Sequence, residues 1–259
     1  MGVYNTKEWL MNHWDEPLEW MSKIDGISER EAISFYRHLQ QHGMFAPSKR
    51  TRATFEGLVQ KKAWKEIERF FLKYKQLWNG PNIGIYLFPI QSSFSLFGER
   101  PNKSGLALGD SMFLFLSPDT DRKQWEAVFV HEYHHCSRMK KLGKKEEEYQ
   151  LLDSILFEGL AEFAVREYVG EEFIASWSKH YTPAQLNKWW RTYIKDHLSL
   201  SKQNPFHDRI LYGKGILPSM LGYAAGFAIV DQCAKKWKKG TKEMLALPAE
   251  TFLAEWNHS

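Results

Sequence analysis

The sequence predicts a mostly helical α+β protein in which a small mixed or antiparallel sheet separates two helical regions. Helix-like apolar patterns fill roughly the first 80 residues, and two short runs of β-branched and aromatic residues follow at 83–90 and 104–118. Helical patterns then resume at about residue 119 and continue to the end of the chain. Helices on either side of a group of strands are typical of the α+β class.

The chain shows no internal repeat, no low-complexity segment and no long linker. We therefore expect a single unit over residues 1–259. It should comprise a helical N-terminal part over about 1–80, a sheet with two long helices over about 81–170, and a helical C-terminal lobe over about 171–259.

The N-terminal part should contain several helices before the sheet begins. One helix is expected in the segment 28–43, which ends at a glycine, and a longer helical stretch is expected over 54–78. The sequence Asn-Gly-Pro-Asn at 79–82 ends that stretch. The strands should follow at 83–90 and 104–118, joined by loops rich in Gly and Ser.

Two long helices are expected directly after the sheet. The polar residues at 119–121 can cap the first, which should run to about Leu142 and end at Gly143. A second amphipathic helix is expected over 147–170, connected to the first by a short turn and returning antiparallel to it.

Composition and charge exclude several classes of protein. The two cysteines, Cys136 and Cys233, form no metal-binding or disulfide pattern, which favours a reducing, cytoplasmic compartment. No secretory signal and no apolar run long enough for a membrane span are visible. The net charge of +4 is scattered among acidic residues, so we expect no nucleic-acid partner and no membrane association, and the oligomeric state stays open.

The first of these two helices carries the pattern H-E-x-x-H at His131, Glu132 and His135. An i, i+4 spacing puts both imidazoles on one helix face, where they can bind a single Zn²⁺. In this pattern the glutamate acts on a zinc-bound water as a base and does not bind the metal. His134 could replace one histidine as a ligand, but the i, i+4 pair is the usual arrangement, so we expect His134 to be left off the metal.

The second helix offers two carboxylates four residues apart, Glu158 and Glu162, within the apolar sequence Leu-Phe-Glu-Gly-Leu-Ala-Glu-Phe. Carboxylates are costly to bury unless a cation receives them. We therefore assign Glu158, about two dozen residues after His135, as the third zinc ligand. Glu162 is expected to accept a hydrogen bond from a zinc-bound imidazole and orient it. The alternative is a pair of solvated carboxylates on an exposed face.

H-E-x-x-H followed by Glu-Gly-Leu-Ala-Glu resembles the gluzincin class of zinc metallopeptidases. The segments HEYHHCSR, LLDSILFEGLAE and GYAAGFAIV, with the opening MGVYNTKEWL, resemble more closely the YjaZ-like proteins, a bacterial family described as predicted zinc-dependent proteases. The similarity extends over nearly the whole chain. It implies a gluzincin-like (zincin) core with His131, His135 and Glu158 as ligands and Glu132 as base.

Three protein ligands leave one zinc position for water, which is typical of a catalytic rather than a structural site. The function expected is therefore hydrolysis of peptide bonds through a zinc-bound water that Glu132 activates. A donor for the oxyanion is also needed, and we favour Tyr223, at the start of a helix where Gly222 and Gly226 allow close packing. Tyr212 and His207 are alternatives.

We thus expect a cytoplasmic metallopeptidase with one Zn²⁺ that acts on peptides or unfolded protein segments. The strand before the zinc helix could pair with an extended substrate. The chain lacks the G-x-M-E-N segment of one large aminopeptidase group, which favours an endopeptidase. Two alternatives stay open, a non-catalytic zinc protein that recruits a partner and a zinc hydrolase of non-peptide amides. Glu132 argues against the first, because a purely structural site needs no base.

Overall fold

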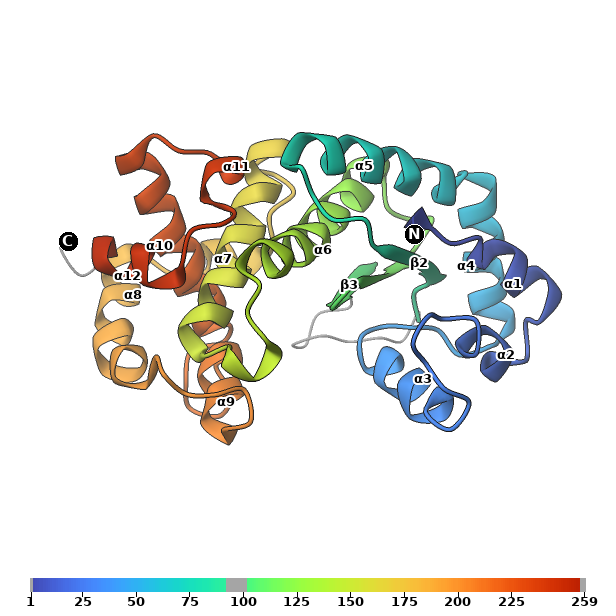
Figure 1. Cartoon of the computed structure of the whole chain (residues 1–259), viewed down its shortest axis with the longest axis horizontal. Coiled ribbons are helices and arrows are strands. Elements are labelled where there is room, and N and C mark those ends of the chain that lie inside the picture. Colours follow the sequence, from blue (N-terminus) through green and yellow to red (C-terminus); the bar gives the residue numbers. More distant parts are fainter. Residues whose placement is uncertain (1, 92–101, 257–259) are drawn as a thin grey trace. The chain divides into compact units, whose positions relative to one another are not determined.

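A computed structural model describes residues 2–91 and 102–256 (Figure 1). The described residues are mostly helical and include a small mixed sheet of four strands, as the sequence predicts. The chain divides into two compact units, Met1–Cys136 and Ser137–Ser259, and the boundary lies inside the helix α6 (Arg122–Leu142). The single functional unit expected from the sequence stays a prediction.

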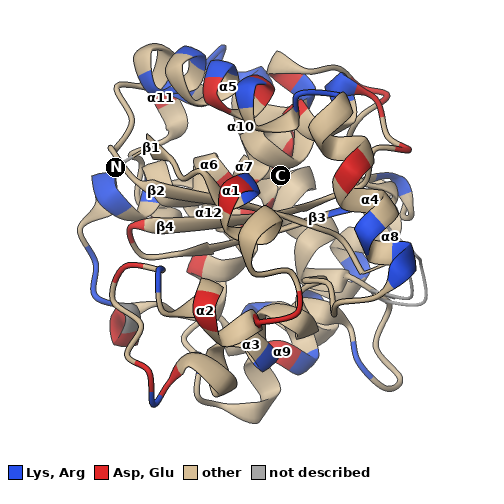
Figure 2. Cartoon of the chain, turned by 90° about the vertical axis from the view of Figure 1, so that its right-hand side faces the viewer, with Lys and Arg blue, Asp and Glu red and all other residues tan. Residues whose placement is uncertain are grey.

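The helices of the first unit form where their apolar residues recur at helical spacing, with the other residues on solvated faces. Charged residues of both signs occur along α5, for example (Figure 2). The helices before the sheet are α1 (Thr6–Asn12), α2 (Pro17–Met21), α3 (Ala32–Gln41), α4 (Lys49–Gln60) and α5 (Ala63–Trp78).

The expectation of one long helical stretch over 54–78 is wrong in one respect. The segment forms two helices. α4 ends at Gln60 and α5 begins at Ala63, and Lys62 between them has a left-handed backbone with φ of 55°. No Gly or Pro marks this break. Tertiary packing explains it, since Phe55 of α4 and Trp64 of α5 pack edge to face across the turn, with ring centroids 6.0 Å apart.

The sheet has the strand order β1-β2-β4-β3. β2 pairs in parallel with β1 and with β4, and β3 pairs antiparallel with β4 at the edge. β2 and most of β4 are buried, which explains their continuous apolar sequences. The strands are β1 (Gly2–Val3), β2 (Gly84–Pro89), β3 (Lys103–Leu108) and β4 (Ser111–Leu116).

The segment 104–118, expected as one strand, is a hairpin of β3 and β4. Gly109 lies at the turn with φ of 53°, a left-handed conformation that glycine adopts without steric cost. β1 is a further difference, because no strand is expected there from the sequence. The hairpin places β3 at the edge of the sheet with its side chains half-buried along most of its length.

The second unit is helical, and its helix α7 (Leu151–Tyr168) begins later than the expected segment 147–170. The cause is a capping box, in which the backbone N–H of Gln150 donates to Asp153 at 3.0 Å. The other α-helices of this unit are α8 (Pro183–Trp189), α9 (Pro205–Tyr212), α10 (Leu221–Trp237), α11 (Thr241–Met244) and α12 (Ala249–Trp256).

Shorter helical segments connect them. These are 3₁₀ turns at Glu146–Glu148, Ser176–Lys179 and Lys195–His197, and a π-helical turn at Trp190–Ile194. Among the described residues, no helix is both long enough and apolar enough to cross a bilayer.

Helices α7 and α10 approach each other at two glycines. A Cβ on Gly159 would lie 2.2 Å from the carbonyl carbon of Gly226, and a Cβ on Gly226 would lie 2.0 Å from the carbonyl oxygen of Ile155. No side chain fits at either position, so the two backbones are in direct contact. The close packing expected at Gly226 is confirmed, and it brings the N-terminal half of α10 against α7 at Ile155 and Gly159.

Candidate metal centre

Helix α6 carries the histidine pair. Its start is fixed by Asp121, whose carboxylate accepts a hydrogen bond from the backbone N–H of Gln124 at 2.7 Å, as expected of a cap. The helix is regular through His131 and His135, whose rings stand perpendicular to each other with centroids 4.7 Å apart. Both imidazoles are half-buried on one face of the helix.

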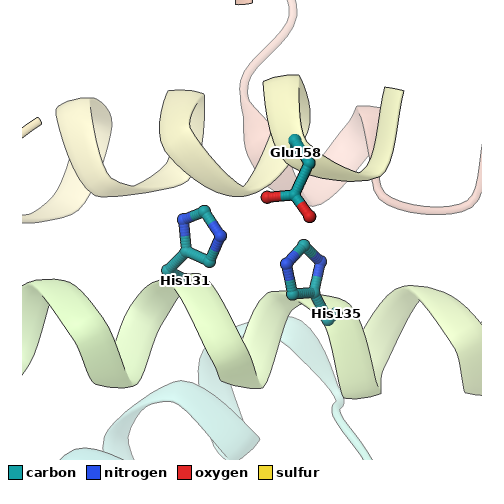
Figure 3. A group of neighbouring side chains, drawn as sticks. All are labelled: His131, His135 and Glu158. Atoms are coloured by element: carbon teal, nitrogen blue, oxygen red, sulfur yellow. The ribbon is translucent and has the colours of Figure 1, made fainter. Parts of the chain in front are cut away.

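Glu158 of α7 completes a group that can hold a metal. One potential ligand atom from each of His131, His135 and Glu158 lies within 4.8 Å of the other two. In Figure 3 the two imidazoles rise from one face of α6 and the carboxylate extends toward them from α7. Two nitrogens and one oxygen in this spacing suit Zn²⁺, which takes such ligands at about 2.0–2.2 Å. The structure thus brings together the three residues predicted as ligands.

Glu132 is buried beside this group and packs against the edge strand. Its side chain is 9% exposed. A Cβ built on Gly105 of β3 would lie 2.3 Å from Cγ of Glu132 and 2.8 Å from its Oε1. The carboxylate therefore occupies the space that any other residue at position 105 would fill, and the absent side chain of Gly105 sets where Glu132 lies.

The other residues of the motif belong to the core of the first unit. His134 is fully buried and its ring lies edge-on to Trp78, with centroids 5.9 Å apart. Within the part of the chain that the structure describes, His134 does not join the group that can hold a metal. Cys136 is buried as well, and burial, aided by the charge of Glu132, raises the pKa of its thiol. It is thus poorly suited to act as a nucleophile.

Tyr223, in the first turn of α10, contacts Glu158 within the second unit. Its hydroxyl is hydrogen-bonded to the Glu158 carboxylate and to Tyr212. Burial, followed by the negative charge of Glu158, raises the pKa of Tyr223 well above its usual value. Burial also raises the pKa of Tyr212 to about 12, with a smaller contribution from Glu158. Both phenols are therefore protonated at neutral pH and can donate hydrogen bonds.

His207 and Glu162 have other contacts in the second unit. The imidazole of His207 is hydrogen-bonded to Ser154 at 3.0 Å and to Asp208 at 2.9 Å. Glu162 is buried and accepts a hydrogen bond from the backbone N–H of Ala175. Its expected role in orienting an imidazole stays a prediction. Of the three candidates for the oxyanion donor, Tyr223 is hydrogen-bonded to Glu158.

Sequence reasoning missed the positions where the site depends on an absent side chain. Gly105 and Gly159 were not singled out, although each is an isolated glycine inside a regular element. Such a glycine is a known sign of close approach, so the signal was present. What it could not reveal is the approaching group, Glu132 in one case and the backbone of α10 in the other.

Comparisons with known proteins agree with this site. Residues 63–254 match the model of a family described as "Predicted Zn-dependent protease (DUF2268)". The chain is also 37% identical, over 262 residues, to a protein of Bacillus subtilis (strain 168) described as "Uncharacterized protein YjaZ", and the match covers 98% of each chain. The resemblance to the YjaZ-like proteins stated from the sequence is thereby confirmed. The gluzincin type stays a prediction. The chain belongs to the YjaZ-like family, DUF2268, whose members are described as predicted zinc-dependent proteases.

Proposed function

We propose that this protein is a zinc-dependent endopeptidase of the gluzincin type that hydrolyses peptides or unfolded protein segments. His131, His135 and Glu158 would hold one Zn²⁺, and Glu132 would act as the base. The observation that carries the proposal is the convergence of two imidazoles and a carboxylate to within 4.8 Å, with Glu132 next to the first of them in the chain. The family description supports the same metal and the same reaction class.

The chemistry follows from the donor set and from Glu132. When bound, zinc supplies Lewis acidity that polarises the scissile carbonyl and promotes ionisation of a water molecule. Glu132 takes the proton of the attacking water and then delivers it to the departing amine. Its burial against Gly105 holds the carboxylate in one place, so little reorganisation is needed when the proton moves.

Tyr223 is our candidate for the group that stabilises the negatively charged oxygen of the reacting peptide. The Tyr223 hydroxyl is protonated, lies beside Glu158 and can donate a hydrogen bond. Tyr212 is hydrogen-bonded to the Tyr223 hydroxyl. A hydrogen bond given to the oxyanion strengthens as charge develops there, which lowers the barrier. The direct contact of α7 and α10 at Gly159 and Gly226 holds this hydroxyl in place.

The edge strand β3 provides a surface for an extended substrate. Among the described strands it lies at the edge of the sheet and pairs with β4. Strand addition gives affinity with little demand on side-chain sequence, as unfolded segments would require. Because Gly105 lies in this strand and touches Glu132, a peptide paired with β3 would run close to the base.

Metal removal tests the proposal directly. Zinc-loaded protein should cleave members of a random peptide library at internal bonds, as read by mass spectrometry. Treatment with a chelator should abolish cleavage, and one equivalent of zinc should restore it. A protein that binds one zinc and leaves every peptide intact would contradict the proposal, and it would favour the non-catalytic alternative.

Gly105→Ala is expected to lower kcat for peptide cleavage by about 10–10²-fold, because displacing a catalytic group by as little as 1 Å can have an effect of this size. The new methyl group would overlap the present position of Glu132. KM and zinc content should change little, since the metal ligands are untouched. Steady-state kinetics and metal analysis provide the measurement.

Ser104→Ala is the matched control, because it changes the adjacent residue of the same strand, on its opposite face. Its kcat should stay within about twofold of wild type. Equal losses in both variants would mean that the strand, and not the position of Glu132, limits the reaction.

A further inference from the structure

Arg138 is a fully buried cation in the second unit whose hydrogen-bonding capacity is mostly unused. Its Nη1 donates to the carbonyl oxygen of Leu245 at 3.0 Å. Within residues 2–91 and 102–256, its Nε and Nη2 have no hydrogen-bond partner. Buried polar groups are satisfied in the great majority of cases, and a buried guanidinium with two unsatisfied N–H positions requires an explanation.

Further unsatisfied donors lie in the same part of the unit. Tyr149 is 5% exposed, and its hydroxyl has no hydrogen-bond partner among the described residues, as is also true of the hydroxyl of Ser137. The guanidinium of Arg138 lies 5.3 Å from the ring centroid of Phe157, and the ring of Tyr149 stands edge-on to the same ring at 5.3 Å. The guanidinium of Arg138 and the ring of Tyr149 thus both lie against Phe157, and the charge of each acts on the other.

Charges of both signs surround these donors, and Glu148, whose charge acts on Tyr149, is exposed. The Nζ atoms of Lys144 and Lys202 lie 5.7 and 5.6 Å from the ring centroid of Tyr149. The buried acid of this region, Asp153, is already engaged, because both of its oxygens accept from Lys144 at 2.9 and 3.0 Å and one also caps α7. Glu250, whose charge also acts on Arg138, is exposed.

Arg138 keeps its charge despite its surroundings. Burial lowers the pKa of Arg138 to about 10, while the charges of Asp153, Tyr149 and Glu250 act in the opposite direction. The guanidinium is therefore still protonated at neutral pH. A buried charge of this kind normally has a counter-ion, and the nearby carboxylate is paired with Lys144 instead.

We propose that Arg138 and Tyr149 bind a small inorganic anion, of which chloride is the physiological representative. An anion would accept hydrogen bonds from Nε and Nη2 of Arg138 and from the Tyr149 hydroxyl, and it would compensate the buried charge of Arg138. A spherical halide suits these donors because it accepts hydrogen bonds from several directions. A water molecule could satisfy the donors but would leave the charge uncompensated.

Crystals of the zinc-loaded full chain grown in bromide test the position of the anion. Bromide replaces chloride and is identified by its anomalous scattering. A peak within hydrogen-bonding distance of the Arg138 guanidinium and the Tyr149 hydroxyl is expected. A well-ordered electron-density feature there with no anomalous signal would identify water and would overturn the proposal.

Thermal unfolding tests the binding energy in solution, independently of any peptidase activity. The zinc-loaded protein should unfold at a higher temperature as chloride replaces gluconate at constant ionic strength. Arg138→Met should abolish this dependence, and Tyr149→Phe, which leaves Arg138 in place, should weaken the apparent chloride affinity several-fold. Tyr149→Phe also serves if Arg138→Met does not fold.

The matched control is Tyr193→Phe, which removes the hydroxyl of a half-buried tyrosine elsewhere in the same unit. It should keep the full response to chloride. A wild-type unfolding temperature that is indifferent to chloride, or a response that both tyrosine variants retain equally, would refute the anion site.

Discussion

Glu132→Gln is expected to lower kcat for peptide hydrolysis by about 10²–10⁴-fold, the range typical of a lost general base. Glutamine has nearly the same shape, so it should fit against Gly105 as the native side chain does. It cannot take a proton from water, and the chemical step should fail while the substrate still binds. Zinc content should stay at one per chain, because position 132 is not among the ligands. Single-turnover cleavage and metal analysis of the same sample measure both.

A second buried glutamate on α6 provides the control. Glu126 is 3% exposed and accepts hydrogen bonds from Lys73 at 2.8 Å and Tyr74 at 2.9 Å, within the first unit. Glu126→Gln removes the same charge from the same helix and should lower the unfolding temperature without changing kcat. If Glu132→Gln retained wild-type kcat, the assignment of the base would be wrong, whatever the fate of the metal site.

Glu158→Ala is expected to remove most of the bound zinc, and activity with it. The change leaves two imidazoles, and a two-ligand site should bind zinc more weakly by well over the ~10–100-fold typical for residues that only orient a ligand. The measurement is a competition titration with a chromogenic chelator. Tyr223 loses its carboxylate partner in this variant, which can also change stability. The unfolding temperature of Glu158→Ala should therefore be measured together with its zinc affinity.

Glu162→Gln is the natural comparison, since Glu162 lies one turn further along α7 and is also buried. If Glu162 orients an imidazole as we expect, the zinc affinity of the Glu162→Gln protein should fall by about 10–100-fold, less than that of Glu158→Ala. Normal zinc content in Glu158→Ala would exclude Glu158 as a ligand. A larger loss of zinc affinity in Glu162→Gln than in Glu158→Ala would make Glu162 the ligand and Glu158 the residue that orients an imidazole.

The elements of the candidate site that could be predicted from the sequence are those that depend on local spacing. An i, i+4 pair of histidines necessarily shares a helix face, and a carboxylate within an apolar helix has few explanations besides a cation. The prediction that Glu158 approaches His131 and His135 followed from this reasoning, and the structure brings the three together. The helix bounds at Leu142 and Gly143 were predictable for the same reason, because capping is a local interaction.

Features that arise from contacts distant in the chain could not be predicted. The break at Lys62 has no local marker, because it results from the packing of α4 and α5. The fit of Glu132 against Gly105 depends on the packing of α6 against β3, and the sequence does not show which helix contacts that strand. Arg138 stands two residues before a Lys-Lys pair with no local sign of burial, and only the structure shows it to be buried.

The pairing of β1 with β2 has a consequence for the order of folding. Gly2 pairs with Gly84, and β2 also pairs with β4, so five helices must be synthesised between β1 and the strand with which it pairs. Closing such a long loop costs conformational entropy, and contacts between its ends therefore form slowly. Each helix, in contrast, depends on local contacts and can form as soon as it is synthesised. The sheet is therefore a late event in the first unit, and the hairpin bearing Gly105 is completed only shortly before α6 and its histidines are synthesised.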